Sequence, residues 1–473
     1  MPDLDFLFHP QSIAIVGTPS DPTDMQGGAV FLHALVRSGY KGDIYPVNPK
    51  LSEILGLKSY PDLLSVPQGL DYVICCLPAS LTPQLIRDCA LNGVKAVSIY
   101  TAGFSEAGEE GGELEQELVS LARQGGIRLI GPNCMGIYCP TTGLSYHSGF
   151  SKDPGCVGLL CQSGGNSNTL TLMGGDRGIR FSKVISYGNA ADLNETDFLE
   201  YLSQDDETRV IAAYIEGIKG GPRFLKALAR AAEIKPVMIL KGGRTQAGTR
   251  AATSHTGALA SASERWDALC RQAGAIQVYT LEEMLDLVET ALYMKPPNGR
   301  RVGVIGWGGG ASVTNTDACE NAGLSVLTFS SQLSQQLRRF TFGPGSSVNN
   351  PVDSAVLTSP SLLSETIRIV ADSKEVDLLL IHMPLATPHM ALDSEAETWK
   401  AAYNAIIETG RSLDIPIALV QPCSDTPESW EVFFSLHQRC VKAGLPLYST
   451  GSQAAQAISR YVQYHIWKSR EGA

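Results

Sequence analysis

His255 lies among small and hydroxyl-bearing residues, an arrangement suited to covalent chemistry. The chain reads KGGRTQAG from Lys241 to Gly248 and SHTGAL from Ser254 to Leu259. A neutral imidazole is a competent nucleophile at neutral pH, since its unperturbed pKa is about 6.5. A nucleophile that serves two reaction centres also needs a backbone with little side-chain bulk. The segment therefore predicts a relay in which His255 accepts a group at one centre and releases it at another. The alternative is a histidine hydrogen-bonded within a polar loop.

A second candidate site follows an apolar run of the strand type. Residues 158–161 lead into Gln162, Ser163, Gly164 and Gly165, where a helix is expected to begin. The unpaired backbone N–H groups of a helix N-terminus carry roughly half an elementary positive charge and bind phosphate. Ser163, Gly164 and Gly165 are therefore predicted to form an anion cradle. A serine-capped helix with glycines for close packing is the alternative.

Glu216 ends another apolar run, Val210–Ile215. A carboxylate at the end of a buried strand requires a partner, because an unpaired buried charge is costly. One interpretation makes Glu216 the partner of a catalytic imidazole. The other makes it a capping residue or an ion-pair partner of Lys219 or Arg223.

The elements that must position these residues follow an α/β pattern. Short apolar runs alternate with helix-like stretches such as 83–92 and 114–123, which is typical of βα units around parallel sheets. Residues 295–300 (KPPNGR) have the composition of a linker. We predict three Rossmann-like or flavodoxin-like parallel-sheet domains in series. The expected strands are 13–16, 71–77, 94–100, 127–130, 157–161, 184–187, 210–215, 237–240, 302–305, 324–327, 376–383 and 417–420.

Composition is consistent with this architecture and disfavours several classes of protein. The chain has 473 residues, enough for about three domains. Its net charge of −11 without a dense basic run argues against a nucleic-acid partner. No apolar run reaches the roughly 20 residues that span a bilayer. The 11 cysteines form no Cys-x-x-Cys pair and lie mostly in apolar runs, so we expect core thiols and a cytoplasmic protein.

Two glycine-containing turns do not match the common nucleotide signatures. The run Ile13–Val16 ends at Gly17, but the G-x-G-x-x-G pattern is absent, so a dinucleotide cofactor is disfavoured. The run Gly306–Ser312 (GWGGGAS) lacks a following Lys-Ser/Thr pair, which disfavours Walker-type ATP hydrolysis. Either turn can be an ordinary strand-to-helix connection.

The segment around His255 resembles the phosphohistidine loop of the ADP-forming acyl-CoA synthetases, also called ADP-forming acetate–CoA ligases, of the succinyl-CoA synthetase superfamily. The resemblance continues along the chain in the order of one subunit type. It includes residues 77–79 (LPA), 100–104 (YTAGF), 131–136 (GPNCMG), 306–312 and 349–353 (NNPVD).

This resemblance implies roles for individual residues. His255 is implied to be phosphorylated, Glu216 to hydrogen-bond one imidazole nitrogen, and Ser163–Gly165 to hold the phosphoryl group. Lys50 is implied to neutralise a phosphate of coenzyme A (CoA), and no metal ligand is implied. Asp21 stands where many relatives have a basic residue, and it would repel phosphate. The implied CoA-binding residues are Gly17, Thr18, Pro19, Ser20, Val47, Asn48, Lys50, Pro78, Thr101 and Asn133.

The resemblance also implies a domain plan and partners. Residues 1–140 are expected to form a CoA-binding Rossmann-like domain, 141–297 a flavodoxin-like domain with the phosphohistidine loop, and 298–473 a second flavodoxin domain of the succinyl-CoA synthetase type. No ATP-grasp fold is found in the chain. An α subunit is therefore implied that binds ADP or ATP and Mg²⁺ through an ATP-grasp β subunit, as an α2β2 hetero-oligomer.

Two other functions stay open at this point. The chain could be a CoA-binding regulatory or sensor protein of the same fold, or a nicotinamide dehydrogenase. Retention of both His255 and Glu216 argues against a sensor, and the missing dinucleotide pattern argues against the dehydrogenase. The acyl group, the choice between ADP and GDP, and the physiological direction are not determined by the sequence.

Overall fold

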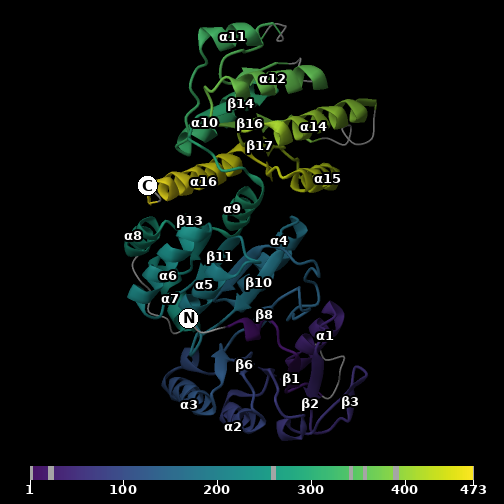
Figure 1. The fold of residues 1–473 in the computed structure, drawn as a ribbon, viewed down its shortest axis with the longest axis vertical. Coiled ribbons are helices and arrows are strands. Elements are labelled where there is room, and N and C mark those ends of the chain that lie inside the picture. Colours follow the sequence, from purple (N-terminus) through teal and green to yellow (C-terminus); the bar gives the residue numbers. More distant parts are fainter. Residues whose placement is uncertain are drawn as a thin grey trace. The chain divides into compact units, whose positions relative to one another are not determined.

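Among the described residues, three β-sheets of five or six strands have helices on their faces (Figure 1). The computed structural model describes residues 4–19, 26–256, 263–339, 345–354, 359–386 and 394–471. The side chains of residues 252–256, 263, 264, 394–396 and 471 lie outside this description. The expected α/β class is confirmed, and each sheet has a core of buried Ile, Leu and Val side chains.

The first sheet has five parallel strands in the order β2-β1-β5-β6-β7. Right-handed crossovers place α1 on one face and α2 and α3 on the other. Short 3-10 helices (η) precede β1 and lie in the loops, and β3 and β4 form a small hairpin. The elements are η1 Asp5–Leu7, β1 Ser12–Val16, α1 Gly28–Ser38, β2 Asp43–Val47, β3 Glu53–Ile54, β4 Leu57–Lys58, η2 Leu63–Ser65, β5 Tyr72–Cys75, η3 Ala79–Leu81, α2 Thr82–Asn92, β6 Ala96–Ile99, η4 Ser105–Ala107, α3 Glu109–Gly125 and β7 Arg128–Ile130.

The middle sheet has six strands in the order β13-β12-β11-β9-β10-β8, and its edge strand β8 is antiparallel to β10. Helices α5, α6 and α8 pack side by side. The elements are β8 Gly136–Tyr138, β9 Val157–Cys161, α4 Gly164–Asp176, β10 Phe181–Ser186, α5 Glu195–Gln204, β11 Val210–Ile215, α6 Gly221–Ile234, β12 Val237–Lys241, α7 Gln246–Thr256, α8 Ser263–Ala273 and β13 Ile276–Val278.

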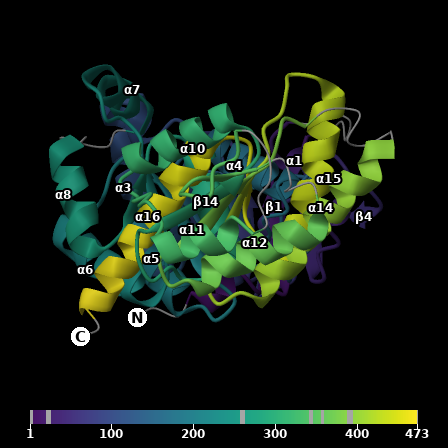
Figure 2. The ribbon, with the colours of Figure 1, turned by 90° about the horizontal axis from the view of Figure 1, so that it is seen from above.

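The third sheet again has five parallel strands, in the order β15-β14-β16-β17-β18. Helices α12 and α14 lie side by side, as do α10 and α16 (Figure 2). The elements are α9 Leu281–Tyr293, β14 Val302–Gly306, α10 Gly309–Asn321, α11 Ser331–Leu337, β15 Val352–Asp353, α12 Pro360–Asp372, β16 Leu378–His382, α14 Ser394–Ser412, β17 Ile417–Val420, α15 Pro427–Ala443, β18 Leu447–Tyr448 and α16 Gly451–Glu471.

The parallel strands of all three sheets share one order. When the parallel strands of each sheet are numbered in the order of the chain, their order across the sheet is 2-1-3-4-5, the flavodoxin-like order. In this order the chain reverses its direction of winding between the first and third strands, and ligands bind outside the carboxyl ends of those strands. The switch points lie between β1 and β5, between β9 and β11, and between β14 and β16.

One expected strand is wrong. Residues 324–327 make a single bridge, between Ser325 and Arg301, and form no named strand. Leu324 is buried, but Leu327 is 57% exposed, so the run does not continue along the sheet. The short strand β15 pairs with β14 instead, through Val352 and Asp353.

The chain divides into two compact units, Met1–Leu281 and Glu282–Ala473. The first two sheets therefore belong to one unit, and α9 belongs to the unit of the third sheet. The finer domain boundaries at residues 140 and 297 stay predictions.

Candidate active site

Gly17 closes the turn at the end of β1, at the switch point of the first sheet. Its φ of +95° lies in the region that favours glycine. A Cβ atom at this position would lie 2.9 Å from the main-chain carbon and oxygen of Cys76, which follows β5. Only glycine therefore lets the two strand ends approach this closely, which keeps the switch point compact.

The residues that follow β1 and β2 are joined by hydrogen bonds. The Thr18 hydroxyl donates to the Val47 carbonyl oxygen over 3.1 Å, and the Asn48 side-chain amide donates to the Thr18 carbonyl oxygen over 2.8 Å. The Asn48 Oδ1 atom accepts from the backbone N–H of Lys50 at 2.7 Å. The structure thus brings Thr18, Val47, Asn48 and Lys50 together at one sheet edge, with the Lys50 side chain exposed.

The other predicted residues of the first sheet lie at the same edge. Thr101, after β6, donates through its hydroxyl to the carbonyl oxygen of Leu77 over 2.6 Å. The backbone N–H of Asn133, after β7, donates to the Thr101 carbonyl oxygen over 3.1 Å. Pro78 is exposed directly after Leu77, and Pro19 follows Thr18. Ser20 and Asp21 lie outside the described residues.

Ser163 caps the helix that starts at the switch point of the middle sheet. Its Oγ accepts a hydrogen bond from the backbone N–H of Asn166 over 3.3 Å, as in a regular N-cap. Gly164 and Gly165 form the first residues of α4. A Cβ at Gly164 would lie 3.1 Å from the Met135 Cγ atom, whereas one at Gly165 would meet the Ser163 Oγ atom at 3.9 Å, so the backbone at Gly165 is the part that is open to close approach by an anion.

Glu216 follows β11, beside Ser163, and is 6% exposed. The Gln162 side chain joins the two strand ends, because its Oε1 atom accepts from the backbone N–H groups of Glu216 at 2.7 Å and Gly217 at 3.0 Å. The Tyr214 hydroxyl donates to the Glu216 Oε1 atom over 3.2 Å. Burial and the Glu216 charge raise the pKa of Tyr214, while the Asn166 side chain lowers it. The Tyr214 phenol therefore interacts with both Glu216 and Asn166, which lies in the first turn of α4.

His255 lies near the end of α7, and its side chain is outside the described residues. The expected loop is helical from Gln246 to Thr256, as its alanines favour. The Thr245 hydroxyl accepts a hydrogen bond from the Gly248 backbone N–H over 3.0 Å, which caps this helix. Helix α7 lies against η4 of the first sheet's domain. Helix α7, which contains His255, thus follows β12 of the middle sheet and contacts the loop after β6 of the first sheet.

Sequence reasoning missed two buried polar residues at this edge, Gln162 and Lys241. They are 5% and 4% exposed, and each stands at or just after the end of an apolar strand. The sequence signal is the one that pointed to Glu216, a polar residue directly after a run of buried aliphatic side chains.

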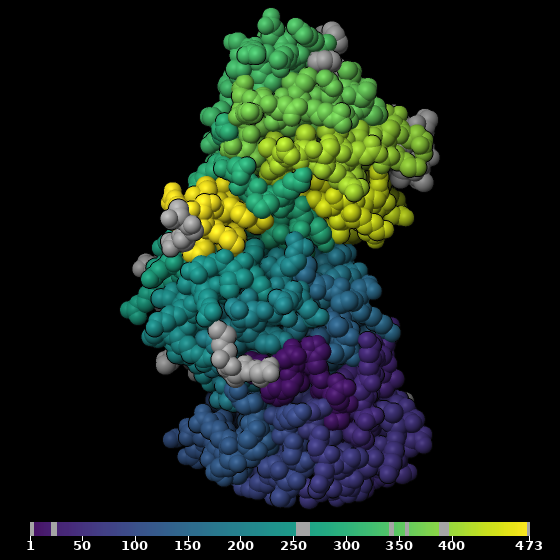
Figure 3. All heavy atoms as spheres, in the orientation of Figure 1, coloured from purple at the N-terminus to yellow at the C-terminus, as the bar shows by residue number. Residues whose placement is uncertain are grey.

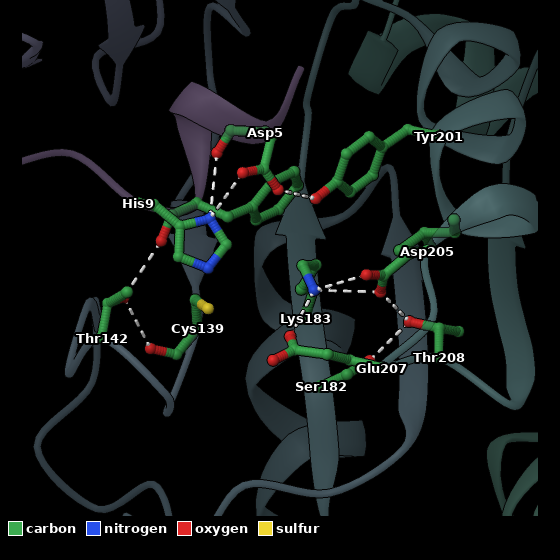
Figure 4. A network of polar contacts seen from close by, with 12 residues as sticks. Asp5, His9, Cys139, Thr142, Ser182, Lys183, Tyr201, Asp205, Glu207 and Thr208 are labelled. Atoms are coloured by element: carbon green, nitrogen blue, oxygen red, sulfur yellow. Dashed lines mark hydrogen bonds and ion pairs between the residues drawn. The ribbon is translucent and has the colours of Figure 1, made fainter. Parts of the chain in front are cut away.

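A second polar network, elsewhere in the same unit, has a structural role (Figure 4). Lys183 in β10 is 1% exposed and forms ion pairs with Asp205 at 2.9 Å and Glu207 at 2.6 Å. The Tyr201 hydroxyl donates to Asp5 over 3.0 Å, and its ring stacks on Phe8 at 4.7 Å between centroids. These contacts dock the N-terminal segment on the domain of the middle sheet, where its purple residues lie on a teal surface in Figure 3.

In the third sheet, the glycine run and the Asn-Pro run are held together by hydrogen bonds. Asn350 accepts from the Val304 backbone N–H at 2.9 Å, and Asp353 accepts from the Gly308 backbone N–H at 2.8 Å. The Trp307 ring packs against Trp399 with centroids 5.0 Å apart. These residues shape the end of β14 and the start of α10.

The described residues contain no group of three or more His, Cys, Asp or Glu side chains placed to hold a metal ion. Within the same residues, no helix is long and apolar enough to cross a membrane. All 11 cysteines are free thiols, and most are buried, as expected of core thiols.

Family models match all three parts of the chain. A CoA binding domain matches residues 11–140, a succinyl-CoA ligase like flavodoxin domain matches 154–291, and a ligase-CoA domain matches 302–418.

Known proteins resemble the whole chain. The α subunit of acetate–CoA ligase [ADP-forming] I of Pyrococcus furiosus is 33% identical over 99% of each chain. Acetate–CoA ligase [ADP-forming] I of Archaeoglobus fulgidus is 35% identical over 82% of this chain, which spans 56% of that protein's length. Among solved structures, dinucleotide forming acetyl-coenzyme A synthetase 1 of Ca. Korarchaeum cryptofilum, in complex with phosphate and ADP, has a TM-score of 0.85. It is 31% identical, with 99% of this chain and 98% of that chain covered.

Proposed function

This chain belongs to the family of the ADP-forming acetate–CoA ligase α subunits, and from this premise we propose that it interconverts acyl-CoA, ADP and phosphate with a carboxylic acid, CoA and ATP. The family is one of acid–CoA ligases, which favours an enzyme over the CoA-binding sensor that the sequence left open. The proposed route uses an acyl phosphate and a phosphohistidine.

Three transfers make up the proposed reaction in the direction of ATP formation. A phosphate oxygen attacks the thioester carbonyl, and the CoA thiolate leaves and takes up a proton. A nitrogen of His255 then attacks the phosphorus of the acyl phosphate and releases the carboxylate. An oxygen of the ADP β-phosphate finally attacks the phosphohistidine, which frees the imidazole and yields ATP. Glu216 is proposed to accept a hydrogen bond from the other imidazole nitrogen and so to fix the reactive tautomer.

The observation that best supports this function is the junction of β9 and β11. Gln162 ties the backbone after Ile215 to the strand that leads into Ser163, so the Glu216 carboxylate and the open N-terminus of α4 stand side by side. An acceptor for an imidazole N–H and a cradle for a phosphoryl group are the two features that a phosphohistidine needs.

We further propose that CoA binds at the carboxyl edge of the first sheet. The matched CoA binding domain spans this sheet, and the turn at Gly17 lies at its switch point, where ligands of this kind of fold bind. The contacts are assigned to the residues predicted from the sequence, with Ser20 among them and Lys50 beside the CoA phosphates.

The substitution Lys50→Glu is expected to weaken CoA binding by roughly tenfold at low ionic strength. It changes the charge beside the phosphates by two, and the loss should shrink as salt screens the interaction. Isothermal titration of CoA into the purified chain at several salt concentrations measures this.

Lys41→Glu is the matched control, because Lys41 is exposed and precedes β2, whereas Lys50 follows it. A strand of five residues spans about 16 Å, well beyond the screening length of about 8 Å at physiological salt. Unchanged affinity in Lys50→Glu, or an equal loss in Lys41→Glu, would remove Lys50 from the CoA site.

A partner subunit is implied, because relatives of this length are α subunits. We propose that the partner is an ATP-grasp β subunit, that it binds ADP or ATP with Mg²⁺, and that the assembly is α2β2. The three matched domain models support this division of labour, since none of them is an ATP-grasp domain. Mg²⁺ would neutralise charge on the nucleotide phosphates.

The proposed function predicts that the isolated chain forms no acyl-CoA from acid, CoA and ATP, and that it does so once the ATP-grasp partner is added. Coupled measurement of ADP release with a panel of small carboxylic acids tests this and identifies the acyl group. Ligase activity of the isolated chain at the rate of the mixture would contradict the division between two subunits.

A further inference from the structure

Lys241 is a buried cation beside Glu216 that the proposed reaction does not yet use. It is the last residue of β12, and its strand partner in β11 is Ile215, directly before Glu216. Its ammonium nitrogen donates to the main-chain oxygen of Glu216 over 2.6 Å and to that of Gly242. The same nitrogen lies 5.9 Å from the centre of the Trp266 ring.

The backbone around Lys241 is packed against the candidate site. A Cβ atom at Gly242 would lie 3.1 Å from the Cγ atom of Glu216 and 2.6 Å from the Tyr214 hydroxyl. Any larger residue at 242 would therefore displace the Tyr214 or Glu216 side chain. The end of β12 thus packs against the Glu216 side chain through Gly242, while the Lys241 ammonium group lies at the Glu216 main-chain oxygen.

Lys183 offers a comparison within the same unit. Lys183 and Lys241 are the two buried lysines in the described part of the chain. Asp205 and Glu207 both form ion pairs with Lys183. Lys241, in contrast, has main-chain oxygens as its hydrogen-bond acceptors, and among the described residues no carboxylate lies within ion-pair distance of it. A buried charge without a close counter-charge is costly, so its retention calls for an anion nearby.

The strand order supplies the place for that anion. Strands β12, β11 and β9 are neighbours, so their carboxyl ends bring Lys241, Glu216 and Ser163 to one edge of the sheet, with Lys241 paired with Ile215, one residue before Glu216. Neighbouring strands lie about 4.8 Å apart, which puts the start of α4 roughly 10 Å from Lys241. Charges at this separation still interact strongly where burial limits solvent screening.

We propose that Lys241 is the buried counter-cation of the phosphoryl site, and that it offsets the negative charge that Glu216 and a phosphate held at Ser163–Gly165 bring to this edge. The inference rests on the proposed function of that site. Lys241 does not touch the phosphoryl group in this arrangement. It is a positioning residue that acts through the electric field of its charge and through its hydrogen bond to the main-chain oxygen of Glu216.

The ionisable groups on the surrounding elements define how this cation responds to pH. Burial lowers the pKa of Lys241, and the Glu216 charge opposes that shift. On β11, the pKa of Tyr214 is raised by burial and by Glu216. On α8, Asp267 is paired with Arg244 at 3.3 Å, and burial raises the pKa of Cys270 to about 12. Lys241 is thus expected to lose its proton before these tyrosine and cysteine groups do as the pH rises.

The test is titration of inorganic phosphate into the purified chain alone, followed by calorimetry or phosphorus NMR. Lys241→Gln keeps a hydrogen-bond donor but removes the charge, and we expect phosphate to bind roughly tenfold more weakly. Lys241→Arg keeps the charge and should retain most of the affinity. Lys219→Gln removes an exposed lysine three residues after Glu216 and should leave the affinity unchanged.

A pH series separates the electrostatic role from a purely structural one. Relative to Lys241→Arg, which keeps its charge, the phosphate affinity of the parent chain should fall as the pH rises through the lowered pKa of Lys241. This comparison decides the matter even if Lys241→Gln does not fold.

Several results would overturn the inference. These are a parent chain that binds no phosphate, equal affinity in the parent and Lys241→Gln, an equal loss in Lys219→Gln, or the same pH profile in the parent and Lys241→Arg. Labelling of His255 with the partner present is scored separately. If the phosphate data fit but His255 is never labelled, the phosphohistidine function fails while the role of Lys241 at the anion site stands.

Discussion

Substitution of His255 by alanine is expected to abolish both the phosphoenzyme and turnover. Incubated with its partner and labelled ATP, the parent chain should acquire a phosphoryl group that is labile in acid and stable in alkali, as a phosphoramidate is. Without the imidazole, no other group on the proposed route carries the phosphoryl between the two centres. Acyl-CoA formation should therefore fall by roughly 10⁴-fold or more, as when the nucleophile of a covalent enzyme is removed.

Peptide mapping of the labelled chain, together with steady-state rates, checks this result. His147→Ala is the matched control, because His147 lies in the same unit and its Nδ1 accepts only a local hydrogen bond, from the Gly149 backbone N–H at 3.0 Å. It should keep both label and rate. Acyl-CoA synthesis by His255→Ala near the parent rate would rule out the relay. His255 would then be a hydrogen-bonded histidine without a catalytic role.

Glu216→Gln has the second largest expected effect, a loss of about 100-fold in the rate of phosphoryl transfer. An amide of the same shape keeps an acceptor for Tyr214 but stabilises the reacting imidazole less well and can select the wrong tautomer. Because the Gln162 side chain binds the Glu216 backbone and not its carboxylate, the variant should keep the local fold. Rapid-quench measurement of label on His255 isolates this step from CoA binding.

Glu233→Gln provides the control for this experiment, since Glu233 is an exposed carboxylate of α6. It should transfer phosphoryl groups at the parent rate. A Glu216→Gln variant that matches the parent in transfer rate would show that Glu216 is a structural strand-end residue.

The strands were predictable where buried aliphatic runs are long. The expected runs 157–161 and 210–215 coincide with β9 and β11, because side chains buried on both faces leave a continuous apolar stretch. Short edge strands such as β15 and β18, of two residues each, have no such signature. The apolar run 324–327 was wrongly predicted to be a strand, because an apolar run forms a strand only where it pairs with a neighbouring strand.

The residues of the candidate site were likewise only partly predictable from the sequence. Ser163 and Glu216 were recognisable because a polar residue directly follows an apolar strand, and parallel strands present their carboxyl ends at one edge. Gln162 and Lys241 have the same signal, but their significance depends on which strands are neighbours. The sequence does not state that β11 lies between β9 and β12, so it could not show that Gln162 binds the Glu216 backbone or that Lys241 does so from the other side.

The sequence by itself determined the class of fold, the family resemblance and which residues have side chains able to take part in a reaction. These properties depend on local composition and periodicity. Tertiary structure decided which of those residues meet. Glu216 lies 53 residues from Ser163 and 25 from Lys241 along the chain, and only the pairing of three parallel strands sets them at one edge. The reason is physical: backbone hydrogen bonds between strands fix neighbours that no local pattern specifies.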